Sequence, residues 1–252
     1  MPDRIDPAPH RIVLVHGFTQ TGTTWAEVAA RLGGLGAEVR CPDQPGHGGA
    51  GDVRTDLTGA AARLAALADG TPATWVGYSM GGRILVSLAL DHPEVVDRLV
   101  LVSTTAGLEA EEERAARRAA DEQLADELEA MGVAAFLERW LAQPLFARLP
   151  PEAAGREARL VNTAEGLASS LRLAGTGTMA PRWHELHRID VPVLVVAGAE
   201  DAKFVALAER LHAAIGANAT LAVLPGAGHA VPFEQPDAFS ELLVSWLSAV
   251  SR

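Results

Sequence analysis

The sequence has a single cysteine, Cys41, among its 252 residues, so no disulfide can form within the chain. A secreted scaffold held together by disulfides is therefore excluded. Basic side chains are also scarce, because 21 lysine and arginine residues face 32 acidic ones and leave a formal net charge of −11. A chain this acidic is a poor general nucleic-acid binder. A local pocket can still bind an anion, since nearby groups outweigh net charge at short range.

Long apolar runs are absent too, and we therefore expect no transmembrane helix and no membrane partner. The segment Met1–His10 contains two acidic residues and three prolines, and it lacks the basic-then-apolar order of a secretory signal peptide. These absences predict a cytoplasmic protein. The length and the 48% hydrophobic content suit one large α/β domain or two small ones with a buried core.

Short apolar runs alternate with longer helical patterns along most of the chain. The expected strands are Ile12–Val15, Ala37–Cys41, Thr74–Val76, Arg98–Ser103, Val193–Ala197 and Thr220–Leu224. The expected helices are Thr24–Leu32, Asp56–Ala68, Met80–Asp91, Phe204–Ile215 and Pro236–Val250. This alternation predicts βαβ units and a doubly wound, mostly parallel sheet with helices on both faces.

The alternation stops after the fourth predicted strand, between Gly107 and His187. This stretch predicts four or five helices and no strand, with segments at Glu111–Arg118, Leu124–Met131, Val133–Trp140, Pro151–Val161 and Gly166–Ala174. We interpret residues 107–187 as a helical lid, and residues 1–106 and 188–252 as the core. Such a lid would cover the carboxyl edge of the sheet, where open α/β sheets bind ligands.

A nucleophile elbow is the clearest motif. Gly77-Tyr78-Ser79-Met80-Gly81 fits the pattern G-x-S-x-G and lies between a predicted strand and a predicted helix. The turn is sharp, so side chains two residues either side of Ser79 would clash, and glycines relieve the clash. The backbone N–H groups of Met80 and of Phe18, which follows the first strand, are the expected oxyanion donors.

The acid and the histidine of a triad are expected after later strands, in the order serine, acid, histidine. Asp201 and Glu200 both follow the fifth strand; we choose Asp201 and keep Glu200 as the alternative. His229 follows the last strand in a glycine-rich loop, whereas His16 and His47 are expected to be structural. No histidine pair has the spacing of a metal site, so the sequence implies neither a metal nor another cofactor.

Taken together, these motifs resemble the α/β-hydrolase superfamily over essentially the whole chain. The matching pieces are HGF at 16–18, DQPGHG at 43–48, GYSMGG at 77–82, GAED at 198–201 and GAGH at 226–229. The first predicted strand begins only at residue 12, so the usual antiparallel hairpin before it is absent or reduced. The resemblance therefore implies an α/β-hydrolase fold with six to seven strands.

A narrower resemblance rests on three further motifs. SMGGR at 79–83, W-x-x-Q-P-L-F at 140–146 and G-x-x-D-x-K-F at 198–204 are together similar to 2-succinyl-6-hydroxy-2,4-cyclohexadiene-1-carboxylate (SHCHC) synthase of menaquinone biosynthesis. That family eliminates pyruvate from a small polyanionic substrate, with the triad serine as base and arginines as carboxylate clamps. By the resemblance, the substrate-binding residues are Tyr78, Arg83, Arg117, Trp140, Arg159 and Lys203.

Each of these assignments has a simpler alternative. Arg117 and Arg159 could lie on a solvated helix face, and Trp140 could pack in the lid core. The triad also fits a serine hydrolase that forms an acyl-enzyme, such as a carboxylesterase, a thioesterase or a carbon–carbon bond hydrolase. Arg83 separates the two functions, because a neutral ester gains little from a guanidinium one helical turn after Ser79. A binding protein on a retired hydrolase fold is a third alternative, and the sequence leaves the oligomeric state open.

Overall fold

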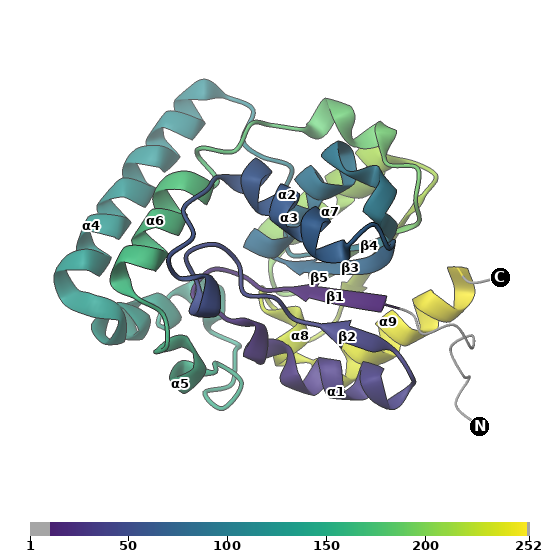
Figure 1. Ribbon diagram of the computed structural model, residues 1–252, viewed down its shortest axis with the longest axis horizontal. Helices are drawn as coiled ribbons and strands as arrows, with labels where there is room; N and C mark the ends of the chain where they lie inside the picture. Colours follow the sequence, from purple (N-terminus) through teal and green to yellow (C-terminus); the bar gives the residue numbers. More distant parts are fainter. Residues whose placement is uncertain (1–10, 251–252) are drawn as a thin grey trace.

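A computed structural model describes residues 11–250 and shows one parallel sheet between layers of helices (Figure 1). Six strands form this sheet within the described range, in the order β2-β1-β3-β4-β5-β6. They are β1 (Arg11–Val15), β2 (Glu38–Arg40), β3 (Ala73–Tyr78), β4 (Val96–Val102), β5 (Val193–Gly198) and β6 (Ala219–Leu224). Every neighbouring pair is parallel, so the predicted α/β-hydrolase fold is confirmed, at the lower strand number. Met1–His10, which the sequence predicts not to be a secretory signal peptide, lies outside the described residues.

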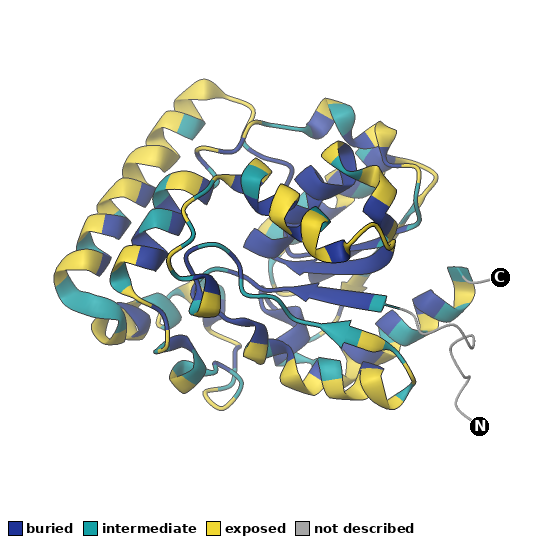
Figure 2. Ribbon diagram, viewed as in Figure 1, coloured by how far each residue is buried: buried dark blue, intermediate teal, exposed yellow. Residues whose placement is uncertain are grey.

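Alternate residues of each strand face opposite helix layers, which explains why the strands are apolar throughout. Val13 and Val15 of β1 pack in the same cluster as helices α2, α3 and α7, whereas Ile12 and Leu14 pack with α1 and α9. These helices are α1 (Ala26–Gly34), α2 (Leu57–Ala68), α3 (Met80–Asp91), α7 (Ala202–Ile215) and α9 (Pro236–Val250). Figure 2 shows the central strands buried and the outward helix faces exposed.

Element ends differ from the predictions by a few residues, for local reasons. β3 runs on to Tyr78 because its pairing with β4 continues to the Tyr78–Val102 register. α7 begins at Ala202 rather than Phe204, since the Asp201 side chain caps it by accepting the Phe204 N–H at 3.2 Å. The short helix α8 (Val231–Glu234) was not predicted.

The segment between β4 and β5 is helical, with α4 (Glu111–Leu141), α5 (Arg156–Arg159) and α6 (Ala164–Ala174). Three predicted segments lie within α4. The predicted break between Arg118 and Leu124 is wrong, because the helix runs through residues 119–123, whereas the predicted break between Met131 and Val133 coincides with Gly132, where the backbone leaves helical geometry. No proline interrupts this stretch, and only Gly132, at φ 75° and ψ 166°, kinks the helix. α5 is also much shorter than the predicted Pro151–Val161. The division into core and lid stays a prediction.

The two long helices of this segment lie beyond the carboxyl ends of the strands (Figure 1). α4 and α6 pack against each other through an apolar cluster that includes Leu128, Phe136 and Leu171. Within residues 11–250, no helix combines the length and apolar character needed to cross a membrane.

Candidate active site

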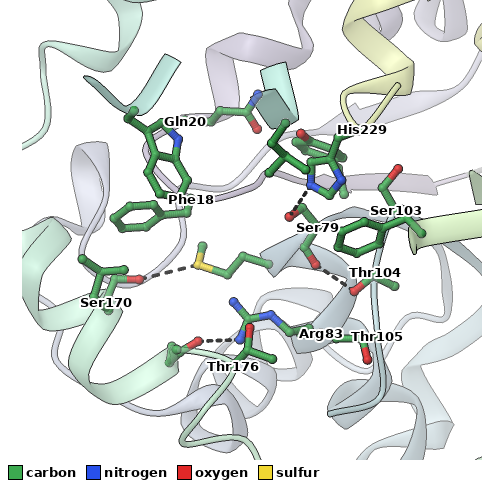
Figure 3. A pocket seen from close by; sticks show the side chains of 18 of the residues that line it. Phe18, Gln20, Ser79, Arg83, Ser103, Thr104, Thr105, Ser170, Thr176 and His229 are labelled. Carbon is green, nitrogen blue, oxygen red and sulfur yellow. Dashed lines mark hydrogen bonds between the residues drawn. The ribbon is translucent and has the colours of Figure 1, made fainter. Parts of the chain in front are cut away.

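Ser79 lies where the strand order reverses. β1 pairs with β2 on one side and with β3 on the other, so the connections leave in opposite directions. Loops after the carboxyl ends of such strands form a crevice, the usual ligand site of an open α/β sheet. Ser79 follows β3 and Phe18 follows β1, so both residues lie at this crevice (Figure 3).

The backbone of Ser79 is strained, with φ 53° and ψ −110°. A Cβ at Gly81 would lie 2.2 Å from the Val15 carbonyl oxygen, and one at Gly77 would lie 2.8 Å from the Gly81 carbonyl carbon. Only glycine fits at these two positions, as the sequence motif requires. The Ser79 N–H donates to the Val102 carbonyl oxygen at 2.9 Å, which ties the strained turn to β4.

The three predicted triad residues meet at this turn. The Ser79 Oγ lies 3.2 Å from His229 Nε2 (Figure 3). On the other side of the ring, His229 Nδ1 lies 3.2 Å from Asp201 Oδ2. Burial alone would raise the pKa of Asp201, but hydrogen bonds from His229 and the Phe204 N–H outweigh it and lower that pKa. The alternative acid, Glu200, instead lies 3.9 Å from Arg148 at the surface. The geometry therefore joins His229 to Asp201 and not to Glu200.

The two predicted oxyanion donors border the same cavity as Ser79. Met80 is the first residue of α3, so its N–H has no acceptor within the helix. Phe18 lies in the loop after β1, where Gln20 Oε1 accepts the Gly17 N–H at 2.9 Å. An anionic oxygen beside Ser79 could meet both amides.

His16 and His47 are fully buried beneath this loop and fix its backbone. His16 Nε2 accepts the Gln44 N–H at 3.0 Å, and His47 Nε2 accepts the Thr19 N–H at 3.1 Å. Burial lowers the pKa of His16 to about 4 and that of His47 to about 3. Both rings are therefore neutral at pH 7, as an acceptor nitrogen requires.

The cavity has an empty volume of about 960 Å³, which includes its opening to solvent. All three predicted arginines line it, and each is held by other parts of the protein. Arg83 Nη1 donates to the Ala174 carbonyl oxygen at 2.6 Å, Arg117 Nε donates to Asp121 Oδ1 at 2.8 Å, and Arg159 Nε donates to the Ala154 carbonyl oxygen at 2.7 Å. Burial lowers the pKa of Arg83 and of Arg159 to about 10, so both stay cationic at neutral pH.

Comparison with known proteins places this chain in a family. The model of the alpha/beta hydrolase family matches residues 12–242. A Bacillus subtilis protein provisionally named as SHCHC synthase is 34% identical over 96% of this chain and 92% of its own length. The chain belongs to the SHCHC synthase group of the alpha/beta hydrolase family.

Other proteins of known name or structure are also similar. A Serratia proteamaculans SHCHC synthase is 29% identical over 94% of this chain and 92% of its own length. The solved structure of MenH from S. aureus superposes with a TM-score of 0.91 at 28% identity, covering 99% of this chain and 98% of that one. A thermophilic esterase from Thermogutta terrifontis, solved with malate bound, gives a TM-score of 0.80 at 25% identity over 96% and 90% of the two chains.

The other predicted substrate-binding residues of this chain, Tyr78, Trp140 and Lys203, also border the cavity. Trp140 packs edge-on against Phe18, with ring centroids 5.1 Å apart, and its buried Nε1 has no hydrogen-bond partner among the described residues. Tyr78 is buried beside His229, and burial raises the pKa of its phenol. Lys203 Nζ lies 5.7 Å from the centre of the Phe204 ring. Trp140 thus packs against Phe18 at the cavity wall, and its indole N–H is buried without a partner among the described residues.

Two supporting residues were missed by the sequence reasoning. Glu234 in α8 accepts the N–H groups of Gly228 and Ala230, at 2.5 and 2.8 Å, and so brackets the backbone of His229. Thr104 Oγ1 donates to the Ser79 carbonyl oxygen at 2.8 Å (Figure 3). An acid five residues after the triad histidine was the available signal for Glu234, whereas Thr104 is defined only by a tertiary contact.

Metal-ligating side chains do not cluster in the part of the chain that the structure describes. No group of three or more histidine, cysteine, aspartate or glutamate residues within 11–250 is arranged to hold an ion. The polar groups of the cavity are hydroxyls, cations and amides, a set that suits an anionic organic ligand.

Proposed function

We propose that this protein eliminates pyruvate from 2-succinyl-5-enolpyruvyl-6-hydroxy-3-cyclohexene-1-carboxylate and releases SHCHC. One observation carries the proposal: the cavity that contains Ser79 is also lined by Arg83, Arg117, Arg159 and Lys203. A neutral ester does not require four cations around the reacting serine. The substrate carries three carboxylates, on the ring, the succinyl arm and the enolpyruvyl arm, and arginine binds carboxylates in a bidentate manner.

Ser79 acts as a base in this scheme. The ring carbon C2 lies next to the succinyl carbonyl, so loss of its proton places negative charge on that carbonyl oxygen. The Ser79 hydroxyl gives its proton to His229 Nε2 and takes the C2 proton, while Asp201 stabilises the imidazolium. The N–H groups of Phe18 and Met80 are proposed to stabilise the oxyanion.

Elimination completes the reaction. The electron pair from the C2–H bond forms the C2–C3 double bond, and the ring π electrons move to form the C4–C5 double bond. The C5–O bond breaks, and its electrons leave with the enolpyruvyl oxygen. The imidazolium of His229 returns one proton to the departing enolate, which becomes pyruvate. Atoms and charge balance without an acyl-enzyme, a metal or a redox cofactor.

Hydrolysis through an acyl-enzyme is the second candidate, because the same hydrogen-bonded serine and free amides support it. The likeness to an esterase fits that chemistry equally well. What separates the two candidates is the requirement for the buried cation at Arg83. An uncharged ester should lose little when this guanidinium is removed.

The deciding experiment compares pyruvate release from freshly generated substrate with hydrolysis of p-nitrophenyl acetate. Arg83→Ala should lower kcat/KM for pyruvate release by roughly 100-fold, the loss expected for a buried charge-assisted contact. Arg188→Ala is the matched control, because Arg188 is exposed and pairs with Glu185 away from the cavity. Arg83→Lys retains a cation and should recover part of the activity if Arg83→Ala proves unstable. Brisk ester cleavage with slow pyruvate release would favour the hydrolase.

A further inference from the structure

Asp121 is a buried carboxylate that is only half satisfied. The residue is 4% exposed and lies on α4, one helical turn after Arg117. Its Oδ1 accepts the Arg117 Nε–H at 2.8 Å, but its buried Oδ2 has no hydrogen-bond partner among the described residues. A buried carboxylate with one ion pair and an unpaired oxygen costs stability. Fold stability therefore does not explain why an acid occupies this position.

The surroundings of Asp121 connect it to the cavity wall. A Cβ at Gly175 would lie 2.4 Å from Asp121 Oδ2, so the chain after α6 packs directly on the carboxylate. The preceding residue, Ala174, accepts the hydrogen bond from Arg83, and Ala174, Gly175, Arg83 and Arg117 all line the cavity. Figure 3 shows Arg83 and Thr176 at this end of the cavity. Asp121 thus contacts Arg117 directly, and it packs against Gly175, the residue after the one that accepts the hydrogen bond from Arg83.

The contact with Asp121 uses only one of the three guanidinium nitrogens of Arg117 as a hydrogen-bond donor. Asp121 occupies Nε, whereas the two terminal nitrogens of Arg117 form no hydrogen bond with any described residue. Those two nitrogens form the fork that binds a carboxylate in a bidentate manner. Asp121 also places a negative charge near two guanidinium groups that repel each other.

We propose that Asp121 is a positioning residue that fixes Arg117 so that its terminal fork faces a carboxylate of the substrate. The proposal rests on the proposed function, because it assigns Arg117 to substrate binding at the same site. Asp121 itself does not touch the substrate. Its loss should therefore weaken binding and leave the chemical step on Ser79 unchanged.

Two substitutions test this role through KM and kcat for pyruvate release. Asp121→Asn keeps an acceptor for Arg117 but removes its charge, and should raise KM about 3-fold; Asp121→Leu removes the acceptor and should raise KM about 10-fold. In both variants kcat should stay within about 2-fold of the original. Asp126→Asn is the matched control, since Asp126 lies on the same helix and pairs with Arg172 outside the cavity.

Stability separates positioning from a structural role. Asp121→Leu removes the desolvation cost of a half-satisfied buried carboxylate, but it also removes the charge that offsets the repulsion between Arg83 and Arg117, so its Tm should stay close to that of the original protein. Arg117→Ala should raise KM by itself, and Asp121→Leu should add nothing in the Arg117→Ala background. A lower Tm together with an unchanged KM in the single variant would overturn the proposal.

A second measurement does not depend on turnover. Succinate, a simple dicarboxylate, should slow the labelling of Ser79 by a fluorophosphonate, and the concentration for half protection should rise about 10-fold in Asp121→Leu. If the original protein releases no pyruvate but succinate protection still depends on Asp121, the proposed function fails and the positioning role stands. Equal protection in every variant, or no protection of the original protein, overturns the positioning role.

Discussion

Two sides of the active site hold their functional groups in different ways: the sheet side, and the side formed by the helices of the predicted lid, residues 107–187, here called the lid side. On the sheet side, backbone geometry sets positions: Ser79 is strained at φ 53°, and the Met80 N–H points from the start of a helix. On the lid side, long side chains reach into the cavity and are fixed by other side chains or carbonyl groups, as Arg117 is by Asp121. Proton transfer needs exact placement of a few atoms, whereas recognition of a polyanion needs charge at the right distance.

This contrast predicts where rate and affinity reside. Changes on the sheet side should reduce kcat, because they disturb the reacting atoms. Changes on the lid side should mainly raise KM, because they disturb groups that hold the substrate in both ground and transition states.

The largest effect is expected for Ser79→Ala. Removal of the base should reduce kcat for pyruvate release by at least roughly 10⁴-fold, while the cations of the cavity remain in place. Steady-state pyruvate release gives the rate, and titration calorimetry with succinate gives the affinity, which should be unchanged. Retention of more than a tenth of the original kcat would remove Ser79 from the mechanism.

A pair of glycines compares the backbone of the two sides. Gly81→Ala would press a Cβ to within 2.2 Å of the Val15 carbonyl oxygen, and we expect a loss of roughly 3 kcal/mol in unfolding free energy with loss of activity. At Gly132 no atom lies within 4 Å of an added Cβ, and only the positive φ opposes it. Gly132→Ala should therefore cost about 1–2 kcal/mol and leave kcat unchanged. Urea unfolding gives the stability of each variant, and pyruvate release gives its kcat. If Gly132→Ala lost as much kcat as Gly81→Ala, the kink in α4 would also position the reacting groups.

The sequence predicted the sheet side far better than the lid side. Ser79, Asp201 and His229 could be placed because each follows an apolar strand, and parallel strands end at one edge. No such rule orders the lid side: the break predicted between Arg118 and Leu124 is wrong, whereas the one predicted after Met131 matches the kink at Gly132. Arg117 and Arg159 came from family resemblance rather than from periodicity. The role of Asp121 could not be predicted, because it depends on the packing of Gly175 against its carboxylate.

Acid sensitivity should originate on the sheet side. His47 is fully buried, and its pKa in the folded protein is about 3, well below the ordinary value of 6.5. Below pH 6.5 the unfolded chain binds a proton that the folded protein cannot, so stability is lost as pH falls from 6.5 toward 3. Between pH 6.5 and 5 this residue alone should contribute a loss of about 2 kcal/mol.

His47→Gln tests that assignment. Its Oε1 can still accept the Thr19 N–H, but the side chain does not titrate. Unfolding free energies from urea titrations at pH 6.5 and 5 should therefore differ less in the variant, by about the same 2 kcal/mol. His16 has a similarly lowered pKa and remains in the variant, so part of the pH dependence should persist. An unaltered pH dependence would show that His47 does not carry the effect.

The smallest effect is expected at Arg172 on α6. Its guanidinium lies between Glu122, Asp126 and Glu129 and so joins α6 to α4. These groups are largely exposed, and solvent and salt screen them. Arg172→Ala should lower Tm by less than about 3 °C, an effect that shrinks further in 1 M NaCl, with KM unchanged. A KM increase as large as that of Asp121→Leu would mean that the surface ion pairs, and not the buried carboxylate, hold the lid arginines in place.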